Sequence, residues 1–265
     1  MRDITSSNEL TGMVSKNPKI KIVADADTMS RAAAETIVEH VSESLQTSDF
    51  YTIALSGGST PKHLYSLLAN DAALRDQIPW ERVHFFWGDE RHVSADHPDS
   101  NYRMADAALL SKVSIPSTNI HRIRTEEPVA ANAAETYEQE IRRFFKIETG
   151  GLPRFNCVLL GMGPDGHTAS LFPGTAALEE TKRLVIANWV GKFQSYRITM
   201  TVPVFNNAER IIFLVSGQEK ANTLKSVLAR RRESDPYPVQ RIRPEHGQLV
   251  WLIDASAAGH LKLNY

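Results

Sequence analysis

Hydrophobic positions along the chain fall into short continuous runs and into stretches where apolar residues recur at helical spacing. Continuous runs are typical of buried strands, and helical spacing is typical of amphipathic helices. Strands are predicted over 19–24, 51–55, 83–87, 155–160, 183–187, 211–215 and 249–253. Helices are predicted from an N-cap at Asp27 to Leu45, from Pro61 to Leu68, and over 101–110, 130–145 and 220–230.

Strands and helices alternate through most of the chain, which favours an α/β fold with a mostly parallel sheet and helices on both faces. A length of 265 residues fits one such domain. We therefore predict a single domain over 1–265, in which 1–18 form a short, weakly ordered N-terminal extension. The polar segment 230–247, with three prolines and many charges, is predicted to be a surface loop.

Charge and cysteine content narrow the possible functions. The chain has 30 Lys and Arg against 31 Asp and Glu, so no overall field attracts nucleic acid or an anionic membrane. Cys157 is the only cysteine, which excludes an intrachain disulfide and a thiolate-rich metal site. No signal-peptide pattern is present, and the apolar runs are strand-sized. We expect a cytoplasmic monomer or small homo-oligomer with no nucleic-acid or membrane partner.

The segment SGGSTP, at 56–61, lies between a predicted strand and a predicted helix. Glycines let the backbone approach a ligand, and the N–H groups at the start of a helix attract anions. Ser56, Gly57, Gly58 and Ser59 are therefore candidate phosphate ligands. A plain strand-to-helix turn with a Ser/Thr cap is the alternative. The Gly-Lys-Ser/Thr ending of a nucleotide-hydrolysing P-loop is missing.

A second glycine-rich segment, GMGPDGH at 161–167, also follows a predicted strand. It satisfies the G-x-G-x-x-G pattern of dinucleotide sites, but Asp165 would lie beside the pyrophosphate and no acidic residue ends the next strand. Asp165 and His167 form a titratable pair at the strand end where α/β sheets bind ligands. His167 is the best candidate for a general base, and a purely structural histidine on a turn is the alternative.

Charged residues after the strand at 83–87 are expected to open onto the same edge of the sheet. Asp89, Glu90, Arg91 and His92 form either a solvated loop or part of a polar pocket. An alternative is a metal site formed by Asp89, Glu90, His92, Asp165 and His167. None of the spacings matches a known helical pair of metal ligands.

Positive charge that could hold an anion comes from three further residues, Lys192, Arg197 and Lys220. Arg197 precedes an alternating apolar stretch, and Lys220 lies at another strand-to-helix junction. Each of them alone is typical of a solvated surface. Together with the segment at 56–61 they could form a phosphate site.

Six ordered motifs resemble those of the family that contains 6-phosphogluconolactonases and glucosamine-6-phosphate deaminases: LSGGSTP, WGDER, HPDSNYRMA, GMGPDGHTASLFPG, RITMTVPVFNNA and VSGQEKA. The resemblance extends over about 25–253. It implies a doubly wound, Rossmann-like α/β sheet and a reaction with no metal or nucleotide cofactor. Deaminases typically have Asn-Glu-Pro where 170–173 reads SLFP, and tyrosine where Arg91 stands, so the resemblance favours the lactonases.

The resemblance implies hydrolysis of 6-phospho-D-glucono-1,5-lactone to 6-phosphogluconate in the oxidative pentose phosphate pathway. The phosphate is then expected at 56–59 with Arg197 and Lys220. The competing hypotheses are an amino-sugar-phosphate deaminase, which would release ammonia from glucosamine 6-phosphate, and a non-catalytic sugar-phosphate sensor.

The resemblance also suggests roles around the reacting carbon. His167 would take a proton from the attacking water and return it to the ring oxygen, and Asp165 would orient the imidazole. Arg91 would stabilise the developing oxyanion or bind the sugar hydroxyls. Asp89 and Lys192 are expected in the pocket.

Overall fold

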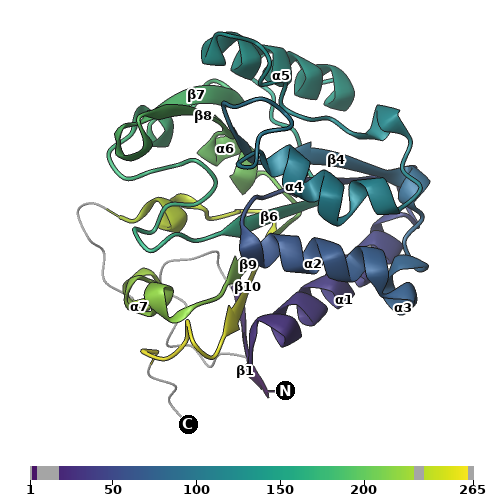
Figure 1. Cartoon of the computed structure of the whole chain (residues 1–265), viewed down its shortest axis with the longest axis vertical. Coiled ribbons are helices and arrows are strands. Elements are labelled where there is room, and N and C mark those ends of the chain that lie inside the picture. The colour runs from purple at the N-terminus through teal and green to yellow at the C-terminus, as the bar shows by residue number, and fades with distance from the viewer. Residues whose placement is uncertain (1, 5–17, 230–235, 262–265) are drawn as a thin grey trace.

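The computed structural model of the chain describes residues 2–4, 18–229 and 236–261 (Figure 1). Its main sheet has seven strands in the order β1-β2-β10-β9-β6-β3-β4. The pairing of β1 with β2 is antiparallel and all other pairings are parallel. The strands are β1 Arg2–Ile4, β2 Lys19–Val23, β3 Tyr51–Leu55, β4 Val83–Trp87, β6 Cys157–Gly161, β9 Arg210–Val215 and β10 Gln248–Asp254.

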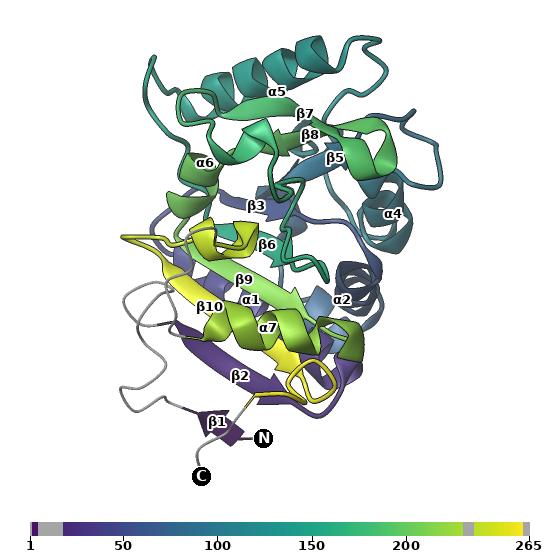
Figure 2. The same ribbon diagram turned by 90° about the vertical axis from the view of Figure 1, so that its left-hand side faces the viewer.

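Helices cover both faces of this sheet. Figure 2 shows α7 in front of β9 and β10, and α1 behind them. The helices are α1 Ala26–Ser44, α2 Ser59–Asn70, α3 Ala72–Arg75, α4 Asn101–Ala108, α5 Ala130–Phe145, α6 Val202–Asn206 and α7 Ala221–Leu228. The predicted α/β fold with a mostly parallel sheet and helices on both faces is confirmed.

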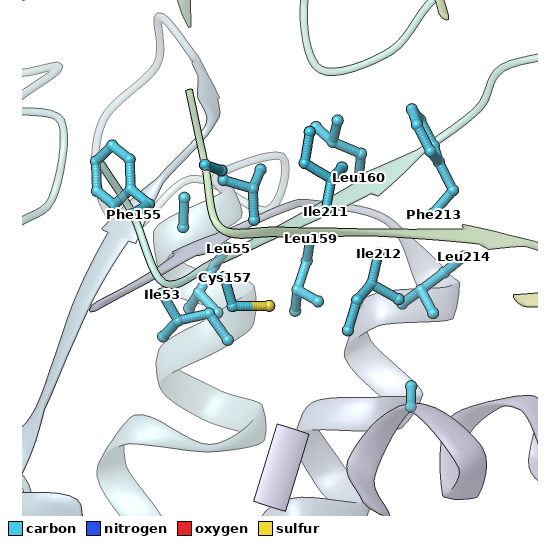
Figure 3. Close-up of a cluster of buried hydrophobic side chains, with 14 of the residues drawn as sticks. Ile53, Leu55, Phe155, Cys157, Leu159, Leu160, Ile211, Ile212, Phe213 and Leu214 are labelled. Atoms are coloured by element: carbon cyan, nitrogen blue, oxygen red, sulfur yellow. The ribbon is translucent and has the colours of Figure 1, made fainter. Parts of the chain in front are cut away.

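The central strands are buried on both sides. In Figure 3, Leu160, Ile211 and Phe213 lie on one side of the strands, and Cys157 and Leu159 lie on the other. All five are fully or almost fully buried. Strands covered on both faces need apolar residues at successive positions, which explains the continuous hydrophobic runs. The sheet thus gives a rigid base for the loops at its carboxyl edge.

A second sheet has three antiparallel strands in the order β5-β8-β7: β5 Asp89–Arg91, β7 Val185–Val190 and β8 Ser195–Met200. It lies beside α5, as Figure 2 shows. The strand predicted at 183–187 overlaps β7, so it belongs to this small antiparallel sheet, and its expected place in the mostly parallel sheet is wrong. The apolar residues of this strand are explained by its burial under α5. An apolar run does not indicate which other strand pairs with it.

Two other local predictions need correction. The N-cap of α1 is Asp25, not Asp27, because the Asp25 carboxylate accepts a hydrogen bond from the Thr28 N–H at 2.7 Å. The described part of 230–247 is only partly a surface loop. Val239 and Ile242 are fully buried there, and the Val239 N–H donates to the Gly166 carbonyl at 3.0 Å.

The described residues near the N-terminus extend the main sheet. β1 pairs with β2, whereas 5–17 and 230–235 lie outside the described residues. The weakly ordered extension therefore stays a prediction. Among the described helices, none combines the length and apolar character needed to cross a bilayer.

Candidate active site

The loops that follow β3 and β6 meet at the middle of the carboxyl edge of the sheet. From β3 the chain runs outward to its neighbour β4, whereas from β6 it continues in the opposite direction to β9 and β10. Such a reversal is the place where open α/β sheets bind ligands. A cleft of about 250 Å³ lies there. Its lining comprises Ser56, Gly57, Gly58, Ser59, Thr60, Pro61, Asp89, Arg91, Asn101, Gly161, Met162, Gly163, His167, Ala169, Leu214 and Lys220.

One wall of the cleft is the loop that joins β3 to α2, which we call the SGGST loop (56–60). Gly58 precedes the helix with a φ of 104°, a conformation that side chains with a Cβ rarely adopt. The buried Tyr65 hydroxyl holds Ser56, because it accepts from the Ser56 N–H at 3.0 Å and donates to the Ser56 carbonyl at 2.9 Å. Among the described residues, no side chain caps α2. Its first N–H groups therefore remain available to an anion.

Asn101, the first residue of α4, packs against this loop. A Cβ on Gly57 would overlap the Asn101 side-chain amide, so only glycine permits the close approach. The Asn101 Nδ2 donates to the Asp89 carbonyl at 2.9 Å. Sequence reasoning did not single out Asn101, although it lies within the quoted motif HPDSNYRMA.

His167 is held on three sides. Its Nδ1 shares a hydrogen bond with the Asp165 carboxylate, and the Phe172 ring stacks on the imidazole at a centroid distance of 4.2 Å. A Cβ on Gly163 would overlap the imidazole, so this glycine makes room for it. Because Asp165 engages Nδ1, Nε2 is the nitrogen left to exchange a proton.

The Asp165 carboxylate is ionised beside this imidazole. Burial raises the pKa of Asp165, but the hydrogen bonds and charge of His167 and the charge of Lys192 outweigh burial, and the net pKa is lowered. The Lys192 Nζ lies 3.3 Å from the second carboxylate oxygen, with 58% of its side chain exposed. Asp165 and Lys192 are therefore placed behind His167, outside the lining of the cleft.

Asp89 and Arg91 alternate with Glu90 along β5, so they share one face of the small sheet. The Asp89 Oδ2 accepts from the Ser170 hydroxyl at 2.6 Å. Arg197 on β8 lies directly opposite Arg91. Burial and then the neighbouring Arg91 charge lower the pKa of Arg197.

Arg197 is not among the residues that line the cleft. Its guanidinium lies over the Phe193 ring at 5.0 Å, and its buried Nε has no hydrogen-bond partner in the described part of the chain. The structure thus brings Arg197 next to Arg91, on the face of the small sheet that Asp89 and Arg91 share.

Lys220 approaches the cleft from the loop after β9. This loop is fixed by Asp254, which accepts from the Ser216 hydroxyl at 2.5 Å and from the Gly217 N–H. Burial lowers the pKa of Lys220, and the charges of Glu219 and Asp254 oppose the shift. An ammonium group that has lost part of its hydration gains more from an anionic ligand than an exposed one.

Two alternative sites are not supported by the geometry. A dinucleotide site needs a helix that begins at its glycine-rich turn, but the turn at 161–167 is followed by an isolated bridge between Thr168 and Leu171. In the described residues, no three His, Cys, Asp or Glu side chains are grouped so that they could hold a metal ion. Glu90, one of the candidate metal ligands, lies on the opposite face of β5 from Asp89.

Known proteins resemble this chain over most of its length. The family model described as glucosamine-6-phosphate isomerases/6-phosphogluconolactonase matches residues 24–251. The chain belongs to this family. A 6-phosphogluconolactonase from Synechocystis sp. is 41% identical over 245 residues, which are 92% of this chain and 99% of that protein. The solved 6-phosphogluconolactonase from Trypanosoma cruzi is 33% identical, with a TM-score of 0.83 over 95% of this chain and 99% of its own.

These relatives confirm the predicted enzyme class, a 6-phosphogluconolactonase. They leave the compartment open. A relative from Arabidopsis thaliana, named 6-phosphogluconolactonase 3, chloroplastic, is 38% identical over 80% of this chain and 65% of its own length. The cytoplasmic location therefore stays a prediction, as do the oligomeric state and the roles of the individual site residues.

Proposed function

We propose that the chain hydrolyses 6-phospho-D-glucono-1,5-lactone, with the phosphate bound by the SGGST loop and Lys220 and with His167 as general base. The observation that carries this proposal is that an anion-binding loop, an ammonium group and an imidazole line one cleft. A ligand gripped at its phosphate presents its other end to a fixed group, which lowers the entropic cost of reaction.

The imidazole of His167 supplies both proton transfers. Nε2 takes a proton from water as the hydroxide oxygen bonds to C1, and the carbonyl becomes a tetrahedral oxyanion. The imidazolium is stabilised by the Asp165 carboxylate at Nδ1. The C1–O bond to the ring oxygen then breaks as the C1=O bond re-forms, and Nε2 returns the proton to the ring oxygen. The product acid ionises and releases one proton to solvent.

Arg91 and Asp89 act on the sugar from the small sheet. Both line the cleft, so the Arg91 guanidinium is the source of positive charge for the oxyanion or the hydroxyls. The Asp89 carboxylate, already fixed by Ser170, has lone pairs left for a sugar hydroxyl. Lys192 acts through Asp165, which it contacts.

The first experiment replaces the base. His167→Ala should lower kcat by about 10²- to 10⁴-fold with a much smaller change in KM, because a positioned general base contributes that much in rate. The rate is measured as proton release from the lactone, with spontaneous hydrolysis subtracted. A variant within about threefold of wild-type kcat would remove His167 from the chemistry.

The same preparation distinguishes the competing activities. A lactonase turns over the lactone and releases no ammonia from glucosamine 6-phosphate, whereas a deaminase releases ammonia. A sugar-phosphate sensor binds 6-phosphogluconate but turns over neither substrate. The second or third result would contradict the proposal.

The proposed phosphate role of Arg197 is tested separately, because Arg197 lies beside Arg91 and not in the lining of the cleft. If Arg197 contributes to phosphate binding, Arg197→Ala raises KM for the phosphorylated lactone more than for unphosphorylated glucono-1,5-lactone. An equal effect on both lactones would contradict the phosphate role.

A further inference from the structure

A buried carboxylate lies directly behind the cleft. The Glu90 side chain belongs to β5, between Asp89 and Arg91, and Glu90 is only 1% exposed. An ionised carboxylate in such a place is costly unless its oxygens accept hydrogen bonds. Burial raises the pKa of Glu90, and hydrogen bonds from three backbone N–H groups offset only part of that shift.

The hydrogen bonds to Glu90 come from two separate segments. Oε1 accepts from the backbone N–H groups of Arg91 and Asn101, both at 2.8 Å. Oε2 accepts from the Tyr102 N–H at 2.8 Å and from the Ser100 hydroxyl at 3.1 Å. Three of the four donors therefore belong to the start of α4, and the carboxylate that they surround is supplied by β5.

This arrangement supplements an ordinary helix cap. The first N–H groups of a helix lack partners within the helix and carry partial positive charge. Ser100 is the N-cap of α4, and its hydroxyl accepts from the Arg103 N–H. Glu90 satisfies the two N–H groups before it, those of Asn101 and Tyr102. The carboxylate therefore fixes α4 to the strand that carries Asp89 and Arg91.

The fixed helix in turn places Asn101 in the active site. The Asn101 amide donates to the Asp89 carbonyl and packs against Gly57 with no room for a Cβ. Figure 1 shows α4 beside α2, the helix that begins at the SGGST loop. A shift of α4 would thus be felt at both β5 and the phosphate-binding loop.

We propose that Glu90 is a positioning residue of the enzyme: it holds α4 so that Asn101 sets the SGGST loop against Asp89 and Arg91. The proposal rests on the lactonase function proposed above. Glu90 itself does not touch the substrate, since Asp89 and Arg91 occupy the other face of β5.

Glu90→Gln is the main test, because it keeps the size of the side chain but turns one acceptor oxygen into an N–H₂ donor that faces other donors. The kcat/KM for the phosphorylated lactone should fall at least about tenfold, since displacements of about 1 Å cost up to 10²-fold. Glu39→Gln, which alters an exposed carboxylate on α1, is the matched control and should stay within about twofold.

A double-mutant cycle separates positioning from simple stabilisation. If Glu90 acts through Asn101, then Asn101→Ala alone lowers kcat/KM, and Glu90→Gln adds little in that background because the coupled contact is already lost. A merely structural role would lower the melting temperature and leave kcat/KM of the folded protein unchanged. Folding of every variant is checked by circular dichroism at the assay temperature.

Additive losses in the cycle, or a folded Glu90→Gln variant with wild-type kcat/KM, would overturn the proposal. If Glu90→Gln does not fold, Ser100→Ala removes one of the four donors and enters the same cycle, with an expected loss of about three- to tenfold and the same criterion of non-additivity.

The cycle is also read out by the dissociation constant for 6-phosphogluconate, measured by calorimetry. If the wild-type protein binds this ligand but turns over no lactone, the proposed function fails while the role of Glu90 is still decided by binding. If the wild-type protein is active and the cycle is additive, only the role of Glu90 fails.

Discussion

The contact between Asp165 and His167 gives the sharpest quantitative prediction. In Asp165→Asn the amide keeps the shape of the side chain but loses the charge that stabilises the imidazolium. A hydrogen bond to a charged group contributes about 1.5–3 kcal/mol. The Asp165 side chain is 30% exposed, so solvent weakens the interaction and the lower part of this range applies. At 1.36 kcal/mol per tenfold in rate, about 1.5–2 kcal/mol corresponds to a kcat about 10- to 30-fold lower.

The assay is steady-state proton release from the lactone in a pH-stat, with the spontaneous rate subtracted. KM should change little, because Asp165 does not line the cleft. Lys192→Ala is the matched control, since it removes the other partner of the carboxylate, which is largely exposed, and should lower kcat at most about threefold. A kcat within threefold of wild type for Asp165→Asn, or a loss confined to KM, would refute the assigned role.

Three further predictions concern Gly57, Lys220 and His40. Gly57→Ala should lower kcat/KM by about 10- to 100-fold, since its Cβ overlaps the Asn101 side-chain amide. Gly191→Ala is the control, because a Cβ there meets nothing within 4 Å. Equal effects of the two substitutions would contradict the close packing of Gly57 on Asn101. Lys220→Met should raise KM for the phosphorylated lactone by about 10-fold or more and leave the unphosphorylated one unchanged, whereas the exposed Lys225→Met should do neither. Burial lowers the pKa of His40, a buried residue of α1, from 6.5 to about 4. As the pH falls, the unfolded chain therefore takes up this proton at a higher pH than the folded chain does. The free energy of unfolding should fall as the pH drops from 6.5 to about 4. Urea titrations should show a shallower fall of the free energy of unfolding with pH in His40→Gln. An identical pH dependence in the variant and the wild type would contradict the assignment of this effect to His40.

Much of the fold could be predicted because the central strands are covered on both faces. The apolar runs at 51–55 and 83–87 coincide with β3 and β4, and 130–145 coincides with α5. The antiparallel sheet could not be predicted in the same way. β5 has only three residues, all charged, and its pairing with β8 depends on contacts about a hundred residues apart.

The candidate site shows the same division. Motifs at the ends of β3, β4, β6 and β9 could be assigned to one edge, since parallel strands bring their carboxyl ends together. The contacts of Asn101 and Phe172 could not, because packing on Gly57 and stacking on His167 exist only in the folded chain. Glu90 was expected in a pocket or a solvated loop. It is buried because N–H groups at the start of α4 donate to its carboxylate, and these contacts exist only in the folded chain.

The segment 236–247 shows why composition alone misleads. Its prolines and charges indicate a surface loop, yet Val239 and Ile242 are buried and the Tyr237 ring leaves no room for a Cβ on Gly166. A few apolar residues within a polar segment are enough to fix it against the loop that carries His167, because burial of each such side chain contributes about 1.5–3 kcal/mol.

A crystal structure of the protein with bound 6-phosphogluconate tests the central claim most directly. The account predicts that the phosphate accepts hydrogen bonds from the SGGST loop and from the Lys220 ammonium, while the carboxylate of the product lies against Nε2 of His167. A phosphate bound elsewhere, or a carboxylate remote from the imidazole, would contradict the account.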